Sequence, residues 1–251
     1  NNSGEATATA LLDPSNFERE RIFEAFRTWG YLEADLDPLG FLKPEPYAGL
    51  RLEGDFVQEA RRIYCGTIGL EFSHISDVDR RRWIQERMET PVPVFDQKRA
   101  LEQLIRADVF EQVLQQRYLG SKRFSLEGVT ALIPLVDEIL DVAAQRGTIE
   151  MVMGMSHRGR LNVIAHVARR PPEEVFAGFE DVDPRSTLGG GDVKYHMGAT
   201  GEYITRSGAN IHIHLVSNPS HLEAVDPVTI GRTRAKQDRV GEDGRNKFLP
   251  L

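Results

Sequence analysis

The sequence is poor in cysteine, in long apolar runs and in positive charge. Cys65 is the single cysteine among 251 residues, so no disulfide forms within the chain and the composition fits a reducing compartment. No apolar run approaches the roughly 20 residues of a membrane-spanning helix, so we expect no membrane association. A net charge of −7 argues against a general nucleic-acid-binding protein.

The composition is otherwise that of a globular protein, with 40% hydrophobic and 27% charged residues. Prolines near residue 92 separate two regions of different texture, and we predict a boundary that divides the chain into residues 1–94 and 95–251. The first residue is Asn1 rather than Met, and the apolar run at Phe248 stops at Leu251. We therefore expect a chain truncated at both ends, whose targeting cannot be judged.

The first region, 1–94, has an extended and helical pattern. Apolar stripes predict helices over 17–30 and 56–63, and a charged helix is predicted over 77–88. The segment between the first two, 31–54, carries three prolines and is typical of an extended wrapping segment.

The second region, 95–251, has the pattern of an α/β fold. Three short apolar runs predict strands of one largely parallel, doubly wound sheet: Ile149–Met155, Ala209–Val216 and Phe248–Leu251. A long helix is predicted over 98–118, with a core face made of Leu101, Leu104, Ile105, Val109, Val113 and Leu114. Another is predicted from Ser125 to Gly147.

A strand that turns sharply into a helix is predicted over 149–161. His157, Arg158 and Arg160 lie in the turn, where ligands bind in open α/β sheets and where helix N–H groups are free. These residue types suit an anionic ligand. A solvated basic loop accounts for the same pattern, and the spacing alone leaves both interpretations open.

The glycine-rich stretch 188–201 fits neither a phosphate-binding P-loop nor a dinucleotide fingerprint. It is interpreted either as a flexible loop that brings Lys194, Tyr195 and His196 to a ligand or as a plain surface loop. His212 and His214 share one face of the next strand, but the sequence does not fix the further ligands that a zinc site needs. We therefore predict no metal site within this chain.

Four motifs together resemble the thiamine-diphosphate-dependent first (decarboxylating) component of the 2-oxoglutarate dehydrogenase complex. They are K-R-F-S-L-E-G (122–128), G-M-S-H-R-G-R-L-N-V (154–163), G-D-V-K-Y-H-M-G (191–198) and N-P-S-H-L-E (218–223). Supporting matches are Y-C-G-T-I-G (64–69) and L-D-P-L-G (36–40), so the resemblance runs in unbroken order from about residue 20 to the end. It implies that the α/β region is the first part of a thiamine-diphosphate-binding domain.

The resemblance also implies the reaction and the residues that serve it. The cofactor's thiazolium accepts electrons as 2-oxoglutarate loses carbon dioxide, and the succinyl group passes to a lipoyl carrier in the tricarboxylic acid cycle. Histidine suits this dianionic substrate, because it donates hydrogen bonds and moves protons near neutral pH. The implied catalytic and substrate-binding residues are His157 and His196, with Thr200 in substrate binding; the implied cofactor-binding residues are Arg158, Ser220, His221 and Leu222. For His221, a helix-turn residue that faces away remains the alternative.

Further expectations concern cofactors and partners. The resemblance implies thiamine diphosphate and Mg²⁺, a homodimer, and a lipoyl-bearing succinyltransferase core as partner. The magnesium ligands are expected beyond Leu251, so the chain alone should be inactive. A 2-oxoadipate dehydrogenase and a truncated non-catalytic scaffold remain alternatives, because one methylene changes specificity by only about 1–3 kcal/mol. We expect a bacterial cytoplasmic protein, or a mitochondrial matrix protein in a eukaryote.

Overall fold

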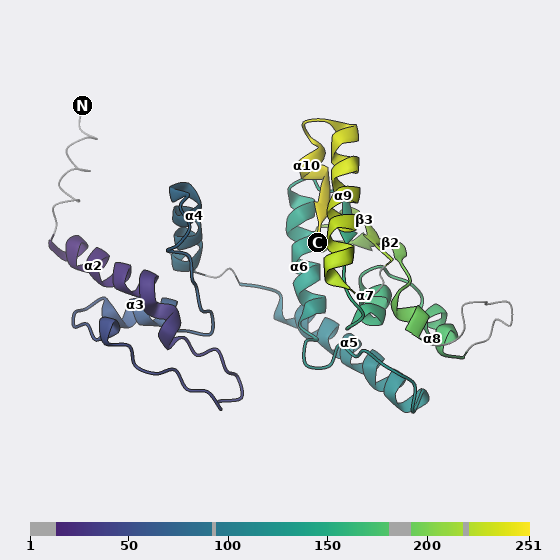
Figure 1. Ribbon diagram of the computed structural model, residues 1–251, viewed down its shortest axis with the longest axis horizontal. Coiled ribbons are helices and arrows are strands. Elements are labelled where there is room, and N and C mark those ends of the chain that lie inside the picture. Colours follow the sequence, from purple (N-terminus) through teal and green to yellow (C-terminus); the bar gives the residue numbers. More distant parts are fainter. Residues whose placement is uncertain (1–13, 92–93, 181–191, 218–220) are drawn as a thin grey trace. The chain divides into compact units, whose positions relative to one another are not determined.

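The structure, a computed structural model, describes residues 14–91, 94–180, 192–217 and 221–251 (Figure 1). Its backbone contacts divide the chain into two compact units, Asn1–Val94 and Phe95–Leu251. Each unit has its own hydrophobic core.

The first unit consists of helices joined by irregular segments. Its helices are α2 (Pro14–Trp29), α3 (Val57–Tyr64) and α4 (Val78–Glu89), with short 3₁₀ turns η1 (Gly30–Glu33) and η2 (Ala48–Leu50). The predicted helices are confirmed, although the described part of α2 already begins at Pro14. Asp77 caps α4 by accepting hydrogen bonds from the backbone N–H groups of Asp79 and Arg80. The core consists of Ile22, Phe23, Phe26, Leu50, Val57, Ala60, Tyr64 and Phe72.

A buried ion pair joins the first and last helices of this unit. Arg27 of α2 donates through Nε to the carboxylate of Glu89 of α4 at 2.7 Å. The hydroxyl of Tyr64 in α3 donates to the same carboxylate at 2.7 Å. Burial raises the pKa of Glu89, but the hydrogen bonds from Arg27 and Tyr64 outweigh that effect and hold it below its ordinary value. Glu89 is therefore ionised at neutral pH and ties the three helices together.

The second unit is built on a four-stranded sheet. In the order β2-β3-β1-β4, the strands are β2 (Ala199–Ile204), β3 (Asn210–Leu215), β1 (Glu150–Met153) and β4 (Phe248–Pro250). β1 runs parallel to both β3 and β4, and β2 pairs antiparallel with β3 at the edge. The three predicted strands and the largely parallel α/β fold are therefore confirmed.

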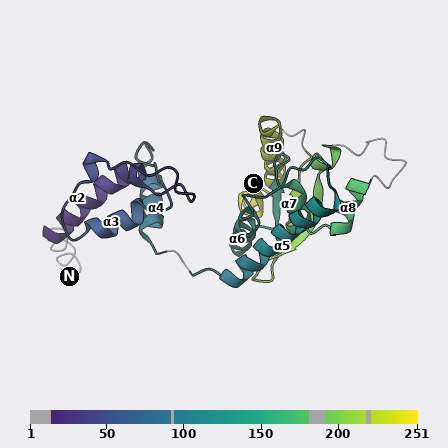
Figure 2. The same ribbon diagram turned by 90° about the horizontal axis from the view of Figure 1, so that it is seen from below.

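Helices cover both faces of this sheet (Figures 1 and 2). On one face, Met151 and Met153 of β1 join a large core with α5 (Gln97–Arg117), α6 (Leu132–Gln145) and α7 (Arg160–His166). On the other face, Val152 packs against Val225 of α9 (Leu222–Val240). Short helices α8 (Pro172–Glu180), α10 (Gly244–Lys247) and η3 (Asp192–Tyr195) complete the unit. This two-sided burial explains why β1 is apolar at successive positions.

Three details of the predicted second region were wrong. The end of the glycine-rich stretch, 199–201, interpreted as loop, is the first half of strand β2. The helix expected from Ser125 begins at Leu132, because a turn precedes it in which Gly128 has φ +87°. In α5 the expected core face is largely exposed, and the buried residues are Ala107, Phe110, Glu111 and Leu114.

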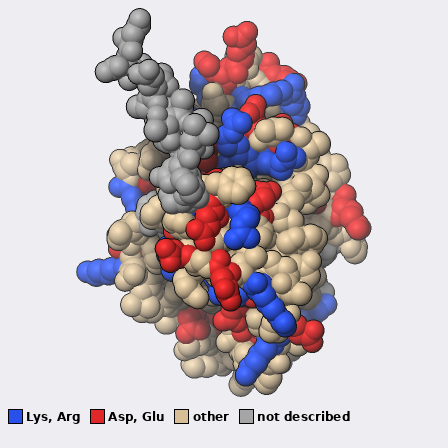
Figure 3. All heavy atoms as spheres, turned by 90° about the vertical axis from the view of Figure 1, so that its left-hand side faces the viewer, with Lys and Arg blue, Asp and Glu red and all other residues tan. Residues whose placement is uncertain are grey.

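The described surface carries mixed charge. On the face seen in Figure 3, acidic and basic side chains are interspersed. Within the described ranges, no helix combines the length and the apolar character that crossing a membrane requires.

Candidate functional site

The carboxyl ends of β1 and β3 bring the sequence motifs together. The N–H of Val216, just after β3, donates to the carbonyl oxygen of Met153 at the end of β1 at 2.9 Å. The N–H of Gly154 donates to Leu251 after β4 at 2.8 Å. Because the strands are parallel, the segments that follow them leave the sheet at one edge. The motif at 154–163 therefore starts beside the segment that follows β3 at Val216 and Ser217.

Arg160 joins these segments from inside. Its side chain is wholly buried, and its guanidinium donates to the carbonyl oxygens of Met155 at 2.8 Å, of Met197 at 3.0 and 2.8 Å, and of Val216. Burial lowers the pKa of Arg160 to about 10, so the group stays charged at neutral pH. Because backbone carbonyl oxygens surround this charge, Arg160 holds the backbone of the site in place and does not face a ligand.

His157 lies in the turn between β1 and α7 and packs against Phe124. The two ring centroids are 3.7 Å apart, and Phe124 also meets Tyr195 edge-on at 4.9 Å. The Tyr195 hydroxyl donates to the carbonyl oxygen of Lys122 at 3.3 Å. The motif 122–128 therefore lies beside both the motif that contains His157 and the motif that contains His196.

Arg158 lies on the exposed side of the same turn. Its Nη1 donates to the carbonyl oxygen of Ser125 at 3.1 Å. The turn itself requires glycine, because Gly159 has φ +70° and its N–H donates to the carbonyl oxygen of Phe124 at 2.9 Å. An exposed guanidinium at the start of a helix can donate hydrogen bonds to an anion that arrives from the solvent.

His196 and Thr200 reach the same edge through β2. His196 directly precedes Met197, whose carbonyl binds Arg160, and the N–H of Gly198 donates to Ser217 Oγ at 3.2 Å. Thr200 is the second residue of β2, is exposed, and pairs in register with His214 of β3. The segment that carries His196 is thus attached to the ends of both central strands.

The described part of the fourth motif, residues 221–223, lies at the start of α9. His221 is the N-cap of this helix, without a side-chain capping bond, and accepts from the N–H groups of Ala224 and Val225 through its carbonyl. His221 and Leu222 are both exposed. Ser220, which the resemblance implies as a cofactor contact, lies outside the described residues.

The two strand histidines lie on the face covered by α9. His212 Nδ1 is 2.8 Å from a carboxylate oxygen of Glu202 on β2. Burial, followed by the nearby charge of Arg232, lowers the pKa of His214. In the part of the chain that the structure describes, no three His, Cys, Asp or Glu residues are arranged to hold a metal ion.

Sequence reasoning missed two parts of this site. Arg160 was grouped with Arg158 as a residue facing an anion, but it points into the protein. Phe124 received no role, although its ring contacts His157 and Tyr195. A signal existed for Phe124, because it lies in a motif shared with the resembled family. No local pattern distinguishes a buried arginine from an exposed one two residues away.

Comparison with known proteins supports the resemblance. No protein-family model matches the chain. The chain is similar to the multifunctional 2-oxoglutarate metabolism enzyme of Mycolicibacterium vanbaalenii, with 39% identity over 260 residues that cover 90% of the chain. It spans only 21% of the length of that relative. This relationship confirms the resemblance to enzymes of the 2-oxoglutarate dehydrogenase type.

Proposed function

From this relationship to an enzyme of 2-oxoglutarate metabolism, we propose that the chain contributes the substrate- and diphosphate-binding edge of a thiamine-diphosphate-dependent 2-oxoglutarate dehydrogenase. The full-length enzyme decarboxylates 2-oxoglutarate and passes the succinyl group to a lipoyl carrier. The observation that supports this most strongly is that the motifs at 122–128, 154–163 and 191–198 meet beside the carboxyl ends of β1 and β3, where Arg160 binds the backbone carbonyls of Met155, Met197 and Val216.

The substrate determines what the site must provide. 2-Oxoglutarate is a dianion, so its pocket needs hydrogen-bond donors that also move protons near neutral pH. In this proposal His157 and His196 donate to the substrate and hold or release its proton, and the hydroxyl of Thr200 adds a donor. The ring of Phe124 against His157 limits rotation of the imidazole and shields it from water.

The donor set fits the cofactor's diphosphate. The exposed guanidinium of Arg158 donates one hydrogen bond to a backbone carbonyl, so its other N–H groups can donate to phosphate oxygens. Ser220, His221 and Leu222, at the start of α9, are proposed to line the cofactor. When bound, the cofactor supplies the electron sink for decarboxylation. A magnesium ligand set of three or more acidic or histidine side chains does not occur among the described residues, so we derive no step from the metal.

The proposal extends to partners and location. A lipoyl-bearing succinyltransferase would accept the product, a second copy would complete a homodimer, and the bacterial origin of the relative supports a cytoplasmic enzyme. Both partners follow from the family resemblance alone.

The test is decarboxylation by the full-length protein. We expect release of carbon dioxide from 2-oxoglutarate that requires added thiamine diphosphate and Mg²⁺. 2-Oxoadipate is the matched competitor, because it differs by one methylene, and we expect its kcat/KM to be lower by roughly 10-fold or more. The absence of turnover with either acid would support the non-catalytic scaffold instead.

A further inference from the structure

A small cationic cavity lies at the other end of α7 from the proposed active site. Its volume is about 80 Å³, and its wall includes Gln103 and Arg106 of α5, His166 at the end of α7, Arg169, and Tyr203 of β2. α7 begins at Arg160 and ends at His166, so its length of about 10 Å separates the two places. The proposed function uses none of these side chains.

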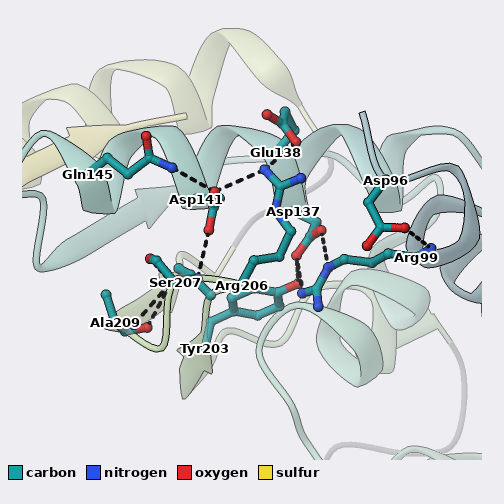
Figure 4. Close-up of polar contacts among 11 residues, drawn as sticks. Asp96, Arg99, Asp137, Glu138, Asp141, Gln145, Tyr203, Arg206, Ser207 and Ala209 are labelled. Carbon is teal, nitrogen blue, oxygen red and sulfur yellow. Dashed lines mark hydrogen bonds and ion pairs between the residues drawn. The ribbon is translucent and has the colours of Figure 1, made fainter. Parts of the chain in front are cut away.

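One side of this cavity is rigid (Figure 4). Arg99 donates through Nε and Nη2 to the two carboxylate oxygens of Asp137, both at 2.7 Å. The hydroxyl of Tyr203 donates to the same carboxylate. Asp137 thus neutralises Arg99 and orients the Tyr203 ring. The charges of Asp137 and Arg99 therefore compensate each other, and neither is available to a ligand.

Two polar atoms in the wall lack partners. His166 Nε2 and Gln103 Oε1 are buried and make no hydrogen bond within the described residues. The Gln103 side chain contributes to lowering the pKa of Asp137, and because an ionised carboxylate only accepts, the amide NH₂ group is the part of Gln103 that faces it. The unpartnered Gln103 oxygen therefore needs a donor, whereas His166 can present its N–H to an acceptor. Buried polar groups normally have partners, so this pair indicates a missing molecule.

Arg169 adds an independent signal. It is the one non-glycine residue with positive φ, +56°, in the part of the chain that the structure describes. It follows α7 where glycine is usual, because Ala168 and Arg170 donate their N–H groups back to Val163 and Ile164. A non-glycine residue at such a strained backbone position is typical of a binding site. Its guanidinium carbon lies 4.8 Å from the Tyr203 ring centroid, which holds the charge at the cavity.

The charge balance at the cavity favours an anion. Within the described ranges, neither Arg106 nor Arg169 forms an ion pair with a carboxylate. Both act electrostatically on His166, whose pKa is lowered by burial and then by these two charges. Glu102 is the acidic residue in the wall, and it reduces but does not cancel the two arginine charges. The adjoining groove, which shares Arg99 and Glu102, adds Lys98 and Asp96, together with Arg206, which is paired with Glu138 and Asp141 (Figure 4).

We propose that this cavity binds a tetrahedral oxyanion that still carries a proton, namely monohydrogen phosphate. Its oxygens accept from Arg106, from Arg169 and from the N–H of His166, and its O–H donates to Gln103 Oε1. The cavity has room for a group the size of a few water molecules. Sulfate has the same shape but no proton at neutral pH, and a carboxylate such as acetate has neither the third oxygen nor the donor. A phosphomonoester is the other source of this chemistry, with its organic part in the adjoining groove.

The experiment measures binding of inorganic phosphate to the full-length protein by calorimetry, with sulfate, acetate and glycerol 3-phosphate at matched ionic strength. We expect saturable phosphate binding and at least about 10-fold weaker binding of sulfate and acetate, since one well-formed charged hydrogen bond is worth about that factor. Tighter binding of glycerol 3-phosphate would identify an ester as the ligand. Equal binding of phosphate and sulfate would overturn the proposal.

Variants locate the binding. Arg106→Gln and Arg169→Gln should each weaken phosphate at least about 10-fold. Arg170→Gln, next to Arg169 but paired with Glu174, should not, and neither should Arg158→Gln at the proposed active site. Arg169→Gly tests the strained position, because glycine accepts the positive φ while removing the guanidinium. If Arg169→Gly lowers the melting temperature, Arg106→Gln, at an exposed position of α5, still shows whether phosphate binds in this cavity. Unchanged phosphate affinity in Arg106→Gln and Arg169→Gln would show that the phosphate binds elsewhere.

Discussion

The guanidinium of Arg160 donates two hydrogen bonds to the backbone carbonyl oxygen of Met197, from Nε at 3.0 Å and from Nη2 at 2.8 Å. Met197 directly follows His196, and the same guanidinium binds the carbonyl of Met155, two residues before His157. One buried side chain therefore fixes the backbone next to both proposed substrate histidines.

Replacement of Arg160 tests this arrangement. Arg160→Met should lower the free energy of unfolding by about 3–5 kcal/mol, because the buried carbonyl oxygens lose their donors. Arg160→Lys keeps the charge but cannot reach all three carbonyls, so it should recover only part of that loss. Urea unfolding of both variants measures the difference. A methionine variant as stable as the parent protein would show that the carbonyls find other partners.

Gly201 tests the position of β2. A Cβ at Gly201 would overlap the backbone carbonyl of Ala168, so Gly201→Ala should push β2 away from the segment that follows α7 and cost roughly 3 kcal/mol. Gly208→Ala is the matched control: its φ is +81° but its surroundings are open, so only about 1 kcal/mol of backbone strain is expected. Melting curves should therefore rank Gly201→Ala well below Gly208→Ala. The reverse ranking would contradict the antiparallel edge strand.

The sequence predicted the strands that are apolar and missed the one that is not. β1, β3 and β4 are apolar runs or clean alternations, and each was found. In β2 only Ala199 and Tyr203 are buried, and the strand includes Gly201, so its pattern resembles a loop. Close approach to Ala168 is the reason for that glycine, and such contact across the chain is not visible in local sequence.

α5 shows a second limit. Its sequence offers two stripes, and the more apolar one, which includes Leu101, Ile105 and Val109, is exposed. The buried stripe contains Glu111, whose carboxylate accepts from the N–H of Leu126 and from the side chain of Asn162. A buried carboxylate satisfied by distant donors overrides the simple hydrophobic pattern. The motifs of the site were found from the sequence, but the residue that holds their segments together, Arg160, was not.

The ion pair of Asp137 predicts a pH dependence. Burial raises the pKa of Asp137, but hydrogen bonds from Arg99 and Tyr203 outweigh it, so the folded value lies below the ordinary 3.8. The stabilisation is therefore complete above that ordinary value and is lost as the pH falls through the folded one. Asp137→Asn should cost about 3 kcal/mol at pH 7 and progressively less below about pH 4. Denaturant titrations across this pH range measure the difference in unfolding free energy between Asp137→Asn and the parent protein, with the exposed Asp238→Asn as control. A difference that does not change with pH would contradict the ion pair of Asp137.

Glu89 offers the corresponding test in the first unit. Glu89→Gln removes the charge that Arg27 and Tyr64 share, and the Arg27 side chain is only 7% exposed. Arg27 keeps its ion pair with Glu20 at 2.8 Å, so the loss of the Glu89 charge should cost about 1–3 kcal/mol. Adding Tyr64→Phe to Glu89→Gln should cost less than the same change in the parent protein, because the neutral amide oxygen of Gln is a weaker acceptor for the hydroxyl than the Glu89 carboxylate. Strictly additive effects in this double-mutant cycle would mean that the three residues do not act as one network.

The last prediction separates the roles of two neighbouring residues, His157 and Arg158, in the full-length enzyme. If His157 moves the substrate's proton, its loss should lower kcat/KM for 2-oxoglutarate by roughly 10²–10⁴ and leave thiamine diphosphate affinity nearly unchanged. Arg158→Ala should do the opposite, weakening the binding of the cofactor by about 10- to 100-fold, because a guanidinium–phosphate contact is lost.

The choice of His157 variant matters, since the ring packs 3.7 Å from that of Phe124. His157→Ala removes this packing as well as the imidazole, and a fall in melting temperature would then confuse the result. His157→Phe keeps an aromatic ring against Phe124 and removes the imidazole's hydrogen bonding and proton transfer. Steady-state kinetics at saturating cofactor, compared with melting curves, therefore decides the question. A stable His157→Phe enzyme with near-normal turnover would end the catalytic assignment of His157.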